Sequence, residues 1–199
     1  MIFIKHRVNS ISDLKKTNTE FGVEIDLRSE NNKIYLNHDP FKKGVSFEKW
    51  IKKFKHKIIV LNVKEEGLED RIIKTLKKNK INNFFFHDQT FSTLVKNMFK
   101  TKVSIRYSEY EHLNKKDYLF KKIKWLWLDN FTKIELNQKF YKYLKRKKVK
   151  ICMVSPELVK KNRASEIKKL VKSLKKNKFH FDAICTKKPD LWKGLLNEK

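Results

Sequence analysis

The sequence predicts an α/β fold, a small (β/α)8 barrel that occupies residues 1–199 as one domain. Three observations carry this prediction. Short apolar runs alternate with amphipathic helical stretches, which is typical of βαβ units and a parallel sheet. The runs number eight, the number of strands that closes such a barrel, and 199 residues is at the lower edge of its size range. A doubly wound open sheet is the alternative arrangement of the same alternating elements.

The eight expected strands are apolar runs of four to seven residues. They cover residues 2–6, 21–27, 57–63, 83–87, 102–106, 124–128, 149–154 and 182–185. The run KIIVLNV at 57–63 is almost continuously apolar, as expected for a parallel strand that is buried on both faces. A smaller extended piece at 33–37 leads into His38 and stands outside the eight.

Helices are expected where apolar residues recur at i, i+3, i+4 and i+7. The clearest such stretch is 165–178, in which Ser165 occupies the position of an N-cap. Three apolar stripes follow this spacing: Ile167, Leu170, Val171 and Leu174; Leu68, Ile72, Ile73 and Leu76; and Leu136, Phe140, Tyr143 and Leu144.

Composition excludes several classes of protein. Hydrophobic residues make up 40% of the chain, so it can form a core, and Gly (4) and Pro (3) are too scarce for a collagen-like or Pro-rich architecture. No apolar run approaches the roughly 18 residues of a membrane-spanning helix, and no signal peptide is expected. Cys152 and Cys185 are too few for a disulfide framework and are expected to be buried. We therefore expect a reduced, cytoplasmic protein.

The net charge is +27, from 49 Lys and Arg against 22 Asp and Glu. The excess is mostly Lys, is spread along the chain and accompanies abundant Asn, Ile and Phe, which favours an AT-rich coding sequence as its origin. A nucleic-acid-binding protein more often concentrates its basic residues on one element, so a nucleic-acid partner is not expected. The charge still favours anionic ligands, including a phosphate-bearing molecule or an anionic membrane surface. Nothing in the sequence indicates the oligomeric state.

Polar residues follow the predicted strands, and the carboxyl ends of barrel strands are where such folds carry their chemistry. The residues in these positions are His6, Arg7, Glu24, Asp26, His38, Asp39, Asn62, Lys64, His87 and Arg106. Glu24 and Asp26 are two apart on one strand and therefore point the same way. Two parallel carboxylates need a shared proton or a cation, and oxygen ligands suit Mg²⁺ or Ca²⁺. Two histidines could remove and supply protons beside such a cation.

The ordered set of motifs resembles the glycerophosphodiester phosphodiesterase family, one of the phospholipase C-like phosphodiesterase barrels. That family has His-Arg-Gly, Glu-x-Asp, His-Asp, Glu-x-Lys and Thr-Asp-x-Pro-Asp in this order. The matching segments here are His6-Arg7-Val8, Glu24-Ile25-Asp26, His38-Asp39, Asn62-Val63-Lys64 and Thr186-Lys187-Lys188-Pro189-Asp190. The resemblance spans almost the whole chain.

The resemblance implies a metal-dependent phosphodiester hydrolase that acts on a glycerophosphodiester or a related phospholipid-derived diester. It implies that His6 and His38 form the acid–base pair. Arg7 and Lys64 are then phosphate-binding residues, while Glu24, Asp26 and Asn62 are ligands of one divalent cation, Mg²⁺ or Ca²⁺. Apart from the roles that the resemblance gives, Asp39, His87, Asp88 and Arg106 also follow predicted strands and are candidate substrate contacts.

Three features depart from the family pattern. Val8 replaces the glycine, and Asn62 replaces a third acidic ligand, which lowers the expected metal affinity. Glu65 could compensate only at a bulged strand end. The segment between Asp39 and Asn62 is too short for the insertion that many members carry after strand two, so an open site is expected. A larger or membrane-bound phosphodiester is then as good a candidate substrate as a glycerophosphodiester. The alternatives are a catalytically reduced barrel that binds a phosphorylated ligand and a basic nucleic-acid-binding protein.

Overall fold

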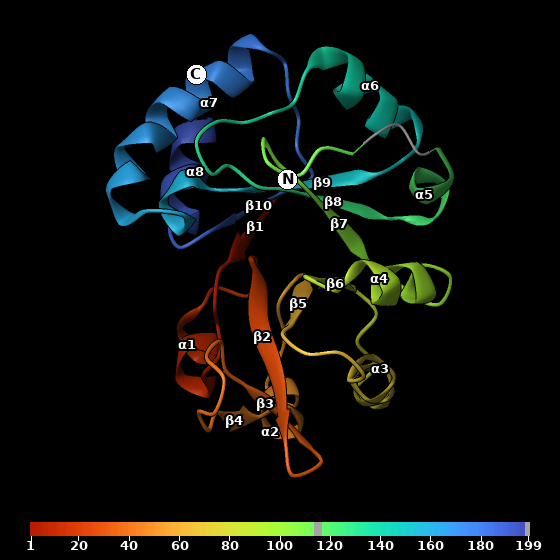
Figure 1. Ribbon diagram of the computed structural model, residues 1–199. Coiled ribbons are helices and arrows are strands. Elements are labelled where there is room, and N and C mark those ends of the chain that lie inside the picture. The colour runs from red at the N-terminus through yellow and green to blue at the C-terminus, as the bar shows by residue number, and fades with distance from the viewer. Residues whose placement is uncertain (114–116, 198–199) are drawn as a thin grey trace. The chain divides into compact units, whose positions relative to one another are not determined.

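The computed structural model describes residues 1–113 and 117–197. Its backbone contacts divide the chain into two compact units, which are described in turn. The N-terminal unit comprises Lys5–Val103, and the C-terminal unit comprises Met1–Ile4 together with Ser104–Lys199. Figure 1 shows that both units alternate strands with helices. The α/β class predicted from the sequence is therefore confirmed.

The N-terminal unit is built on a mixed sheet with the strand order β4-β3-β2-β5-β6. Its three parallel strands are β2 (Gly22–Glu30), β5 (Ile59–Val63) and β6 (Phe84–His87). Strand β3 (Lys33–Leu36) runs antiparallel to β2, and the short β4 (Val45–Ser46) pairs with β3. The register places Asp26 beside Asn62 and Asn62 beside His87. This register brings polar residues from three strands to one edge of the sheet.

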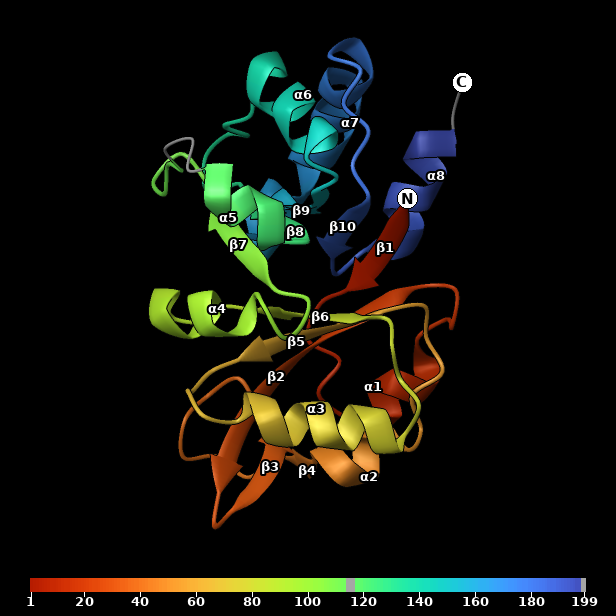
Figure 2. The ribbon, with the colours of Figure 1, turned by 90° about the vertical axis from the view of Figure 1, so that its right-hand side faces the viewer.

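Helices follow the strands of this unit and bury one apolar stripe each. They are α1 (Ile11–Lys16), α2 (Phe47–Ile51), α3 (Glu69–Lys78) and α4 (Phe91–Asn97). In α3 the predicted stripe is real, since Ile72 and Leu76 are fully buried while the Lys residues of its last turn are exposed. Figures 1 and 2 both show α3 outside the strands.

The C-terminal unit repeats the same organisation with the strand order β1-β10-β9-β8-β7. Its strands are β1 (Ile2–Lys5), β7 (Ser104–Tyr107), β8 (Trp125–Leu128), β9 (Lys150–Val154) and β10 (Ala183–Thr186). The pairings from β7 through β10 are parallel. The helices are α5 (Asp117–Lys122), α6 (Gln138–Arg146), α7 (Glu166–Lys176) and α8 (Pro189–Asn197), with 3-10 turns η1 (Pro156–Leu158) and η2 (Lys161–Ser165) after β9.

Each of the eight predicted strands is present within two or three residues of its expected bounds. The extended piece before His38 becomes β3, the second strand of a hairpin with β2. Ser165 is the N-cap residue of α7, as expected, but its side chain makes no capping hydrogen bond. Because η2 runs directly into α7, Ser165 already has helical backbone angles, and its hydroxyl donates back to the carbonyl of Asn162 at 3.4 Å instead of accepting from the helix.

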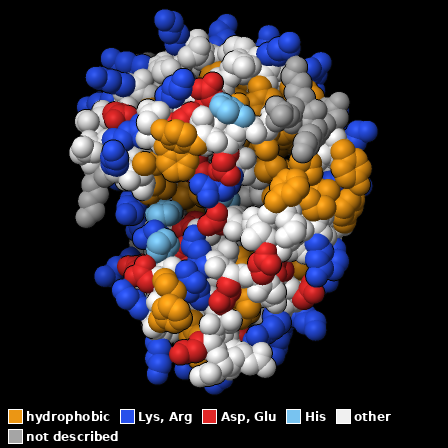
Figure 3. Space-filling model, in the orientation of Figure 1, with side chains coloured by type: hydrophobic (Ala, Val, Ile, Leu, Met, Phe, Trp, Pro, Cys, Tyr) orange, Lys and Arg blue, Asp and Glu red, His pale blue; other side chains and the backbone are white. Residues whose placement is uncertain are grey.

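The predicted interior residues are buried. Cys152 and Cys185 are fully buried thiols, and Trp125 and Trp127 are at most 5% exposed, as expected for packing residues. Lys and Arg side chains are spread over both units on the face seen in Figure 3, in keeping with the distribution along the sequence. Among the residues described, no helix is long and apolar enough to cross a membrane.

Candidate active site

The centre of the candidate site is a pair of acidic side chains on β2. Glu24 and Asp26 alternate with Val23, Ile25 and Leu27, so both carboxylates leave the same face of the strand. That face is not solvated, because both residues are 0% exposed. Two neighbouring carboxylates in a dry interior are costly unless a proton or a cation compensates one of their charges.

The surroundings of Glu24 favour its protonated form. Burial and the nearby charge of Asp26 raise its pKa from 4.5 to about 7. Three groups face its two oxygens: the amide of Asn62 donates to Oε1 at 2.9 Å, the backbone N–H of Arg7 donates to Oε2 at 2.8 Å, and His6 Nε2 lies 3.8 Å from Oε2. Within the N-terminal unit, the segment His6–Arg7 and strand β5 thus both contact Glu24.

Asp26 is held by a different set of groups. The side chain of Asn9 accepts from the Asp26 backbone N–H at 2.9 Å and donates to its Oδ2 at 2.8 Å. Lys64 Nζ lies 3.6 Å from Oδ1, and Arg7 Nε lies 3.9 Å from Oδ2. Lys64 also contacts Asp88 at 3.0 Å. Both predicted phosphate-binding residues are therefore beside the carboxylate pair.

The oxygen atoms of this cluster suit a divalent cation. Asp26 Oδ1 and Asn62 Oδ1 are buried and accept no hydrogen bond from any described residue. Buried acceptors without donors are uncommon in proteins, and hard cations bind such oxygens. Within residues 1–113 and 117–197 no group of three or more His, Cys, Asp or Glu has a metal-binding arrangement. The third ligand in this cluster would therefore be the Asn62 amide. Glu65 does not replace it, because its carboxylate accepts from the Ser29 backbone N–H.

The backbone at the end of β1 takes an unusual conformation. Arg7 has φ of 58°, in the left-handed region that few non-glycine residues occupy, and this places its N–H on Glu24. The next residue, Val8, is 1% exposed and its N–H donates to the Glu24 carbonyl at 2.8 Å. The positive φ therefore falls at Arg7, and position 8 serves as a core residue.

His38 is oriented by its neighbour. Its Nδ1 is 2.9 Å from Asp39 Oδ1, and hydrogen bonds from His38 and Lys42 lower the pKa of Asp39 to about 2. An ionised carboxylate can only accept, so Nδ1 carries the hydrogen of this hydrogen bond. The segment is tied to the acidic strand, since Asn37 N–H donates to the Asp26 carbonyl at 3.2 Å and Arg28 donates twice to the His38 carbonyl.

Two further predicted residues have different placements. His87 ends β6 opposite Asn62 and is 4% exposed, so it belongs to the polar edge of the N-terminal unit. Arg106 lies in the C-terminal unit, where it pairs with Asp129 at 3.1 Å and with Glu111 at 3.2 Å. A role for either in contacting substrate stays a prediction.

Asp88, a candidate substrate contact like His87, accepts a hydrogen bond from Lys64. Two other residues in contact with the site lack a role in the sequence-based reasoning. Arg28 follows Glu24 and Asp26 at the next alternate position of β2, and that alternation could have identified it. Asn9 has no comparable signal, because only the fold of the segment after β1 brings its amide onto Asp26.

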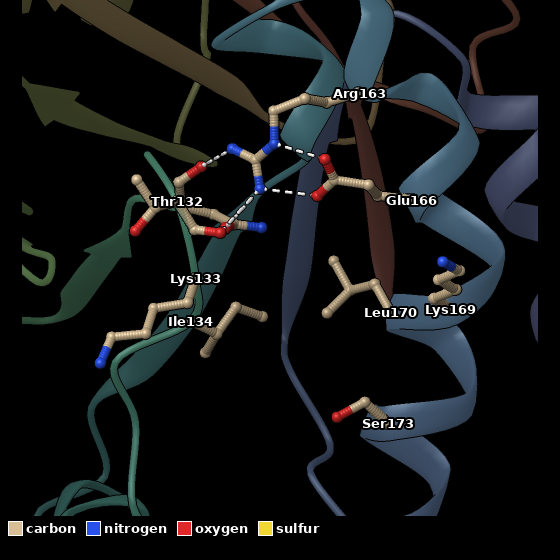
Figure 4. Close-up of a pocket in the computed structure, with 9 residues that line it drawn as sticks. Thr132, Lys133, Ile134, Arg163, Glu166, Lys169, Leu170 and Ser173 are labelled. Atoms are coloured by element: carbon tan, nitrogen blue, oxygen red, sulfur yellow. Dashed lines mark hydrogen bonds and ion pairs between the residues drawn. The ribbon is translucent and has the colours of Figure 1, made fainter.

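A cavity lies in the C-terminal unit and has a volume of about 480 Å³. Figure 4 shows it between the segment that follows β8 and helix α7. Arg163 closes one end by donating to Glu166 and to the carbonyls of Asn130, Phe131 and Thr132. None of the predicted site residues lines this cavity.

The chain is similar in fold to several solved structures of phosphodiesterases. A glycerophosphodiester phosphodiesterase from Thermotoga maritima matches with a TM-score of 0.73 at 16% identity, covering 98% of this chain and 97% of its own. This chain shares the fold of the glycerophosphodiester phosphodiesterases. An Oleispira antarctica phosphodiesterase, solved with the product sn-glycerol-3-phosphate, matches with a TM-score of 0.71 at 13% identity over 100% and 97% of the two chains.

An Agrobacterium tumefaciens glycerophosphodiester phosphodiesterase matches at 0.69 and 8% identity, over 97% of this chain and 99% of its own. The sequence matches no protein-family model and no curated protein. The structural likeness thus agrees with the predicted α/β class, and it extends over nearly the whole chain.

Proposed function

We propose that this protein is a phosphodiester hydrolase that acts on a glycerophosphodiester or a related phospholipid-derived diester. The observation that carries the proposal is the buried Glu24–Asp26 pair with His6, Asn62 and Lys64 around it, at the strand ends of a fold shared with known phosphodiesterases. Closure of the strands into a (β/α)8 barrel is part of the same proposal.

The two histidines take opposite roles. The His38 ring is held by Asp39 through Nδ1, which leaves Nε2 to accept the proton of the attacking water. His6 lies 3.8 Å from the Glu24 carboxyl at the centre of the site, and it donates the proton to the leaving alcohol. The phosphorus–oxygen bond to that alcohol breaks as the bond to water oxygen forms.

Positive charge beside the pair binds the phosphate. Arg7 is 42% exposed at its side chain and Lys64 is 15% exposed, so both reach the solvent side of the acidic pair. Glu24, Asp26 and Asn62 would hold one divalent cation, Mg²⁺ or Ca²⁺. When bound, such a cation neutralises charge that develops on phosphoryl oxygens.

Hydrolysis of glycerophosphocholine and of bis(p-nitrophenyl) phosphate tests this proposal. Each is assayed with Mg²⁺, with Ca²⁺ and with EDTA, for the wild type, His38→Ala and the matched control His180→Ala. His180 is exposed and lies in the C-terminal unit. We expect cation-dependent turnover that falls roughly 10²–10⁴-fold in His38→Ala and is unchanged in the control.

Three outcomes would contradict parts of the proposal. Turnover that survives in His38→Ala would show that His38 is not the base. Turnover that persists in EDTA would show that the reaction does not need the cation. Absence of turnover on either diester, together with tight binding of glycerol phosphate, would favour the catalytically reduced barrel instead.

A further inference from the structure

The loop between β3 and β4 holds an apolar ring in solvent. Phe41 is 105% exposed, whereas the other large apolar side chains called exposed range from 37% to 71%. Its φ is 59°, in the left-handed region, where a bulky residue is rare. Such a conformation persists only where the surrounding structure enforces it, so the exposure of this ring is a built feature of the loop.

Several contacts fix the loop in this shape. The side chain of Asn37 donates to the carbonyls of Lys42 and Lys43 at 3.1 and 3.3 Å, across the turn formed by Pro40 and Phe41. At the far end Gly44 packs against β3 so closely that a Cβ atom there would lie 2.0 Å from the Leu36 carbonyl oxygen. Only glycine fits at that position, and the tip is therefore preorganised.

The same loop carries part of the candidate active site. His38 and Asp39 precede Phe41 by three and two residues, and Asn37 N–H binds the Asp26 carbonyl at 3.2 Å. A surface that binds the Phe41 ring would therefore lie close to His38 and to the Glu24–Asp26 pair. Binding of the loop would fix how far that surface is from the phosphate that reacts.

The charges around the ring identify the surface that fits it. Lys42 and Lys43 follow Phe41 and are both exposed, and Lys42 is bridged to Asp39 at 2.8 Å. An apolar tip with an adjacent ammonium pair is complementary to an anionic bilayer, where an aromatic ring reaches the acyl boundary while Lys remains at the headgroups. The net charge of +27 adds long-range attraction to such a surface.

We propose that the Phe41 loop, residues 37–44, docks on an anionic lipid bilayer and presents the site to phosphodiesters of membrane lipids. The substrate part of this inference rests on the proposed function. The ring enters the headgroup region, and the two lysines contact anionic lipids. A lysophospholipid or phospholipid diester is then the substrate class, in preference to a diester free in water.

A fluorescent label at the tip tests docking without any assay of activity. Phe41→Cys is labelled with an environment-sensitive nitrobenzoxadiazole dye, which is selective because both native cysteines are fully buried. Phe99→Cys is the matched control, a second exposed phenylalanine of the same unit. With phosphatidylcholine vesicles containing phosphatidylglycerol, we expect a blue shift and brightening at position 41 and no change at position 99.

Two results would overturn docking. One is an unchanged spectrum at position 41, or equal changes at both positions. The other is a change at position 41 that needs no vesicles and grows with protein concentration, because that would assign the ring to a second copy of the chain.

Activity then separates docking from catalysis. We expect Phe41→Ala to hydrolyse bis(p-nitrophenyl) phosphate as the wild type does, while its partitioning onto the anionic vesicles and its hydrolysis of a lysophospholipid held in them fall about tenfold. Equal vesicle hydrolysis by the two proteins would overturn the inference. Insertion of the labelled Phe41→Cys protein, together with a wild type that hydrolyses no diester, would overturn the proposed function and leave the docking surface standing.

Discussion

Both units of the molecule bury carboxylates near the ends of their parallel strands, but the two sets of carboxylates differ in the hydrogen bonds that they accept. In the C-terminal unit Glu157 accepts hydrogen bonds from Ser155, from Thr186 at 2.5 Å and from the Lys187 backbone at 3.1 Å. In the N-terminal unit Glu24 and Asp26 face each other's charge, and Asp26 leaves one buried oxygen without a donor. A saturated carboxylate supports the fold, whereas an unsaturated pair is available for a ligand.

The saturated cluster also explains the last motif of the resemblance. Thr186 accepts from the Lys188 N–H at 2.9 Å and donates to Glu157, so it fixes the entry to α8. Trp192 of that helix donates to Ser155 at 2.8 Å. The Thr186–Asp190 segment therefore has a structural role in this unit.

The largest expected effect is on activity. Replacing Glu24 by Gln removes one charged oxygen ligand while keeping the shape of the side chain. We expect kcat to fall by about 10³-fold, or about 4 kcal/mol, because stabilisation of phosphoryl charge is lost. Cation-dependent hydrolysis of bis(p-nitrophenyl) phosphate measures it. A loss smaller than tenfold would place Glu24 outside the site.

The next effect is on stability and concerns the saturated cluster. Glu157→Ala leaves the donors of Ser155, Thr186 and Lys187 buried and unpaired, so we expect the free energy of unfolding to drop by about 3 kcal/mol. Urea denaturation measures the drop. The isosteric Glu157→Gln should lose less, since it keeps one acceptor. An unaffected Glu157→Ala would mean that the hydrogen bonds around this carboxyl contribute nothing net.

A smaller, pH-dependent effect belongs to Asp129. Burial is the main cause that raises its pKa from 3.8 to about 6, although Arg106 opposes the shift. The folded state thus binds more protons than the unfolded state between these two values, so this group makes stability fall as pH rises from about 4 to 6. We expect a fall of about 2 kcal/mol that Asp129→Asn lacks, measured by urea denaturation across that range. If the stability of the wild type and of Asp129→Asn changes with pH in the same way, the raised pKa does not belong to Asp129.

The smallest expected effect is a gain in stability from a substitution of Glu24, opposite in sign to the loss expected from Glu157→Ala. In EDTA at pH 8 the raised pKa of Glu24 means that its ionised form destabilises the folded state, and this penalty grows as pH rises from 4.5 through 7. Glu24→Gln should therefore be more stable than the wild type by about 1 kcal/mol. Thermal unfolding at pH 5 and pH 8 measures this gain, which should be present at pH 8 and small at pH 5. If Glu24→Gln is less stable than the wild type at both pH values, the claim that the Glu24–Asp26 pair lacks hydrogen-bond donors is contradicted.

The sequence predicts much of this arrangement because the signals are local. Strand β5 is recognisable from its unbroken apolar run, and Glu24 and Asp26 share a face because strands have a period of two. Long-range packing explains what the sequence leaves out. Asn9 reaches Asp26 across 17 residues, and the left-handed turn at Arg7 depends on a hydrogen bond to another strand.

Ser165 is the N-cap residue that the sequence predicts, but its side chain does not cap the helix, for a related reason. A serine before an apolar stripe is a good cap only if the chain enters the helix from an extended conformation. Here the chain enters α7 from a 3-10 turn, and nothing in the residues before Ser165 is specific for that turn.

The most direct test of the difference between the two buried clusters is a calorimetric titration of Mg²⁺ and of Ca²⁺ into the wild type, Glu24→Gln and Glu157→Gln. An unsaturated site predicts that one cation binds per wild-type chain, that Glu24→Gln abolishes this binding, and that Glu157→Gln retains it. Absence of binding to the wild type, or equal binding by wild type and Glu24→Gln, would contradict the claim that the Glu24–Asp26 pair is a ligand site.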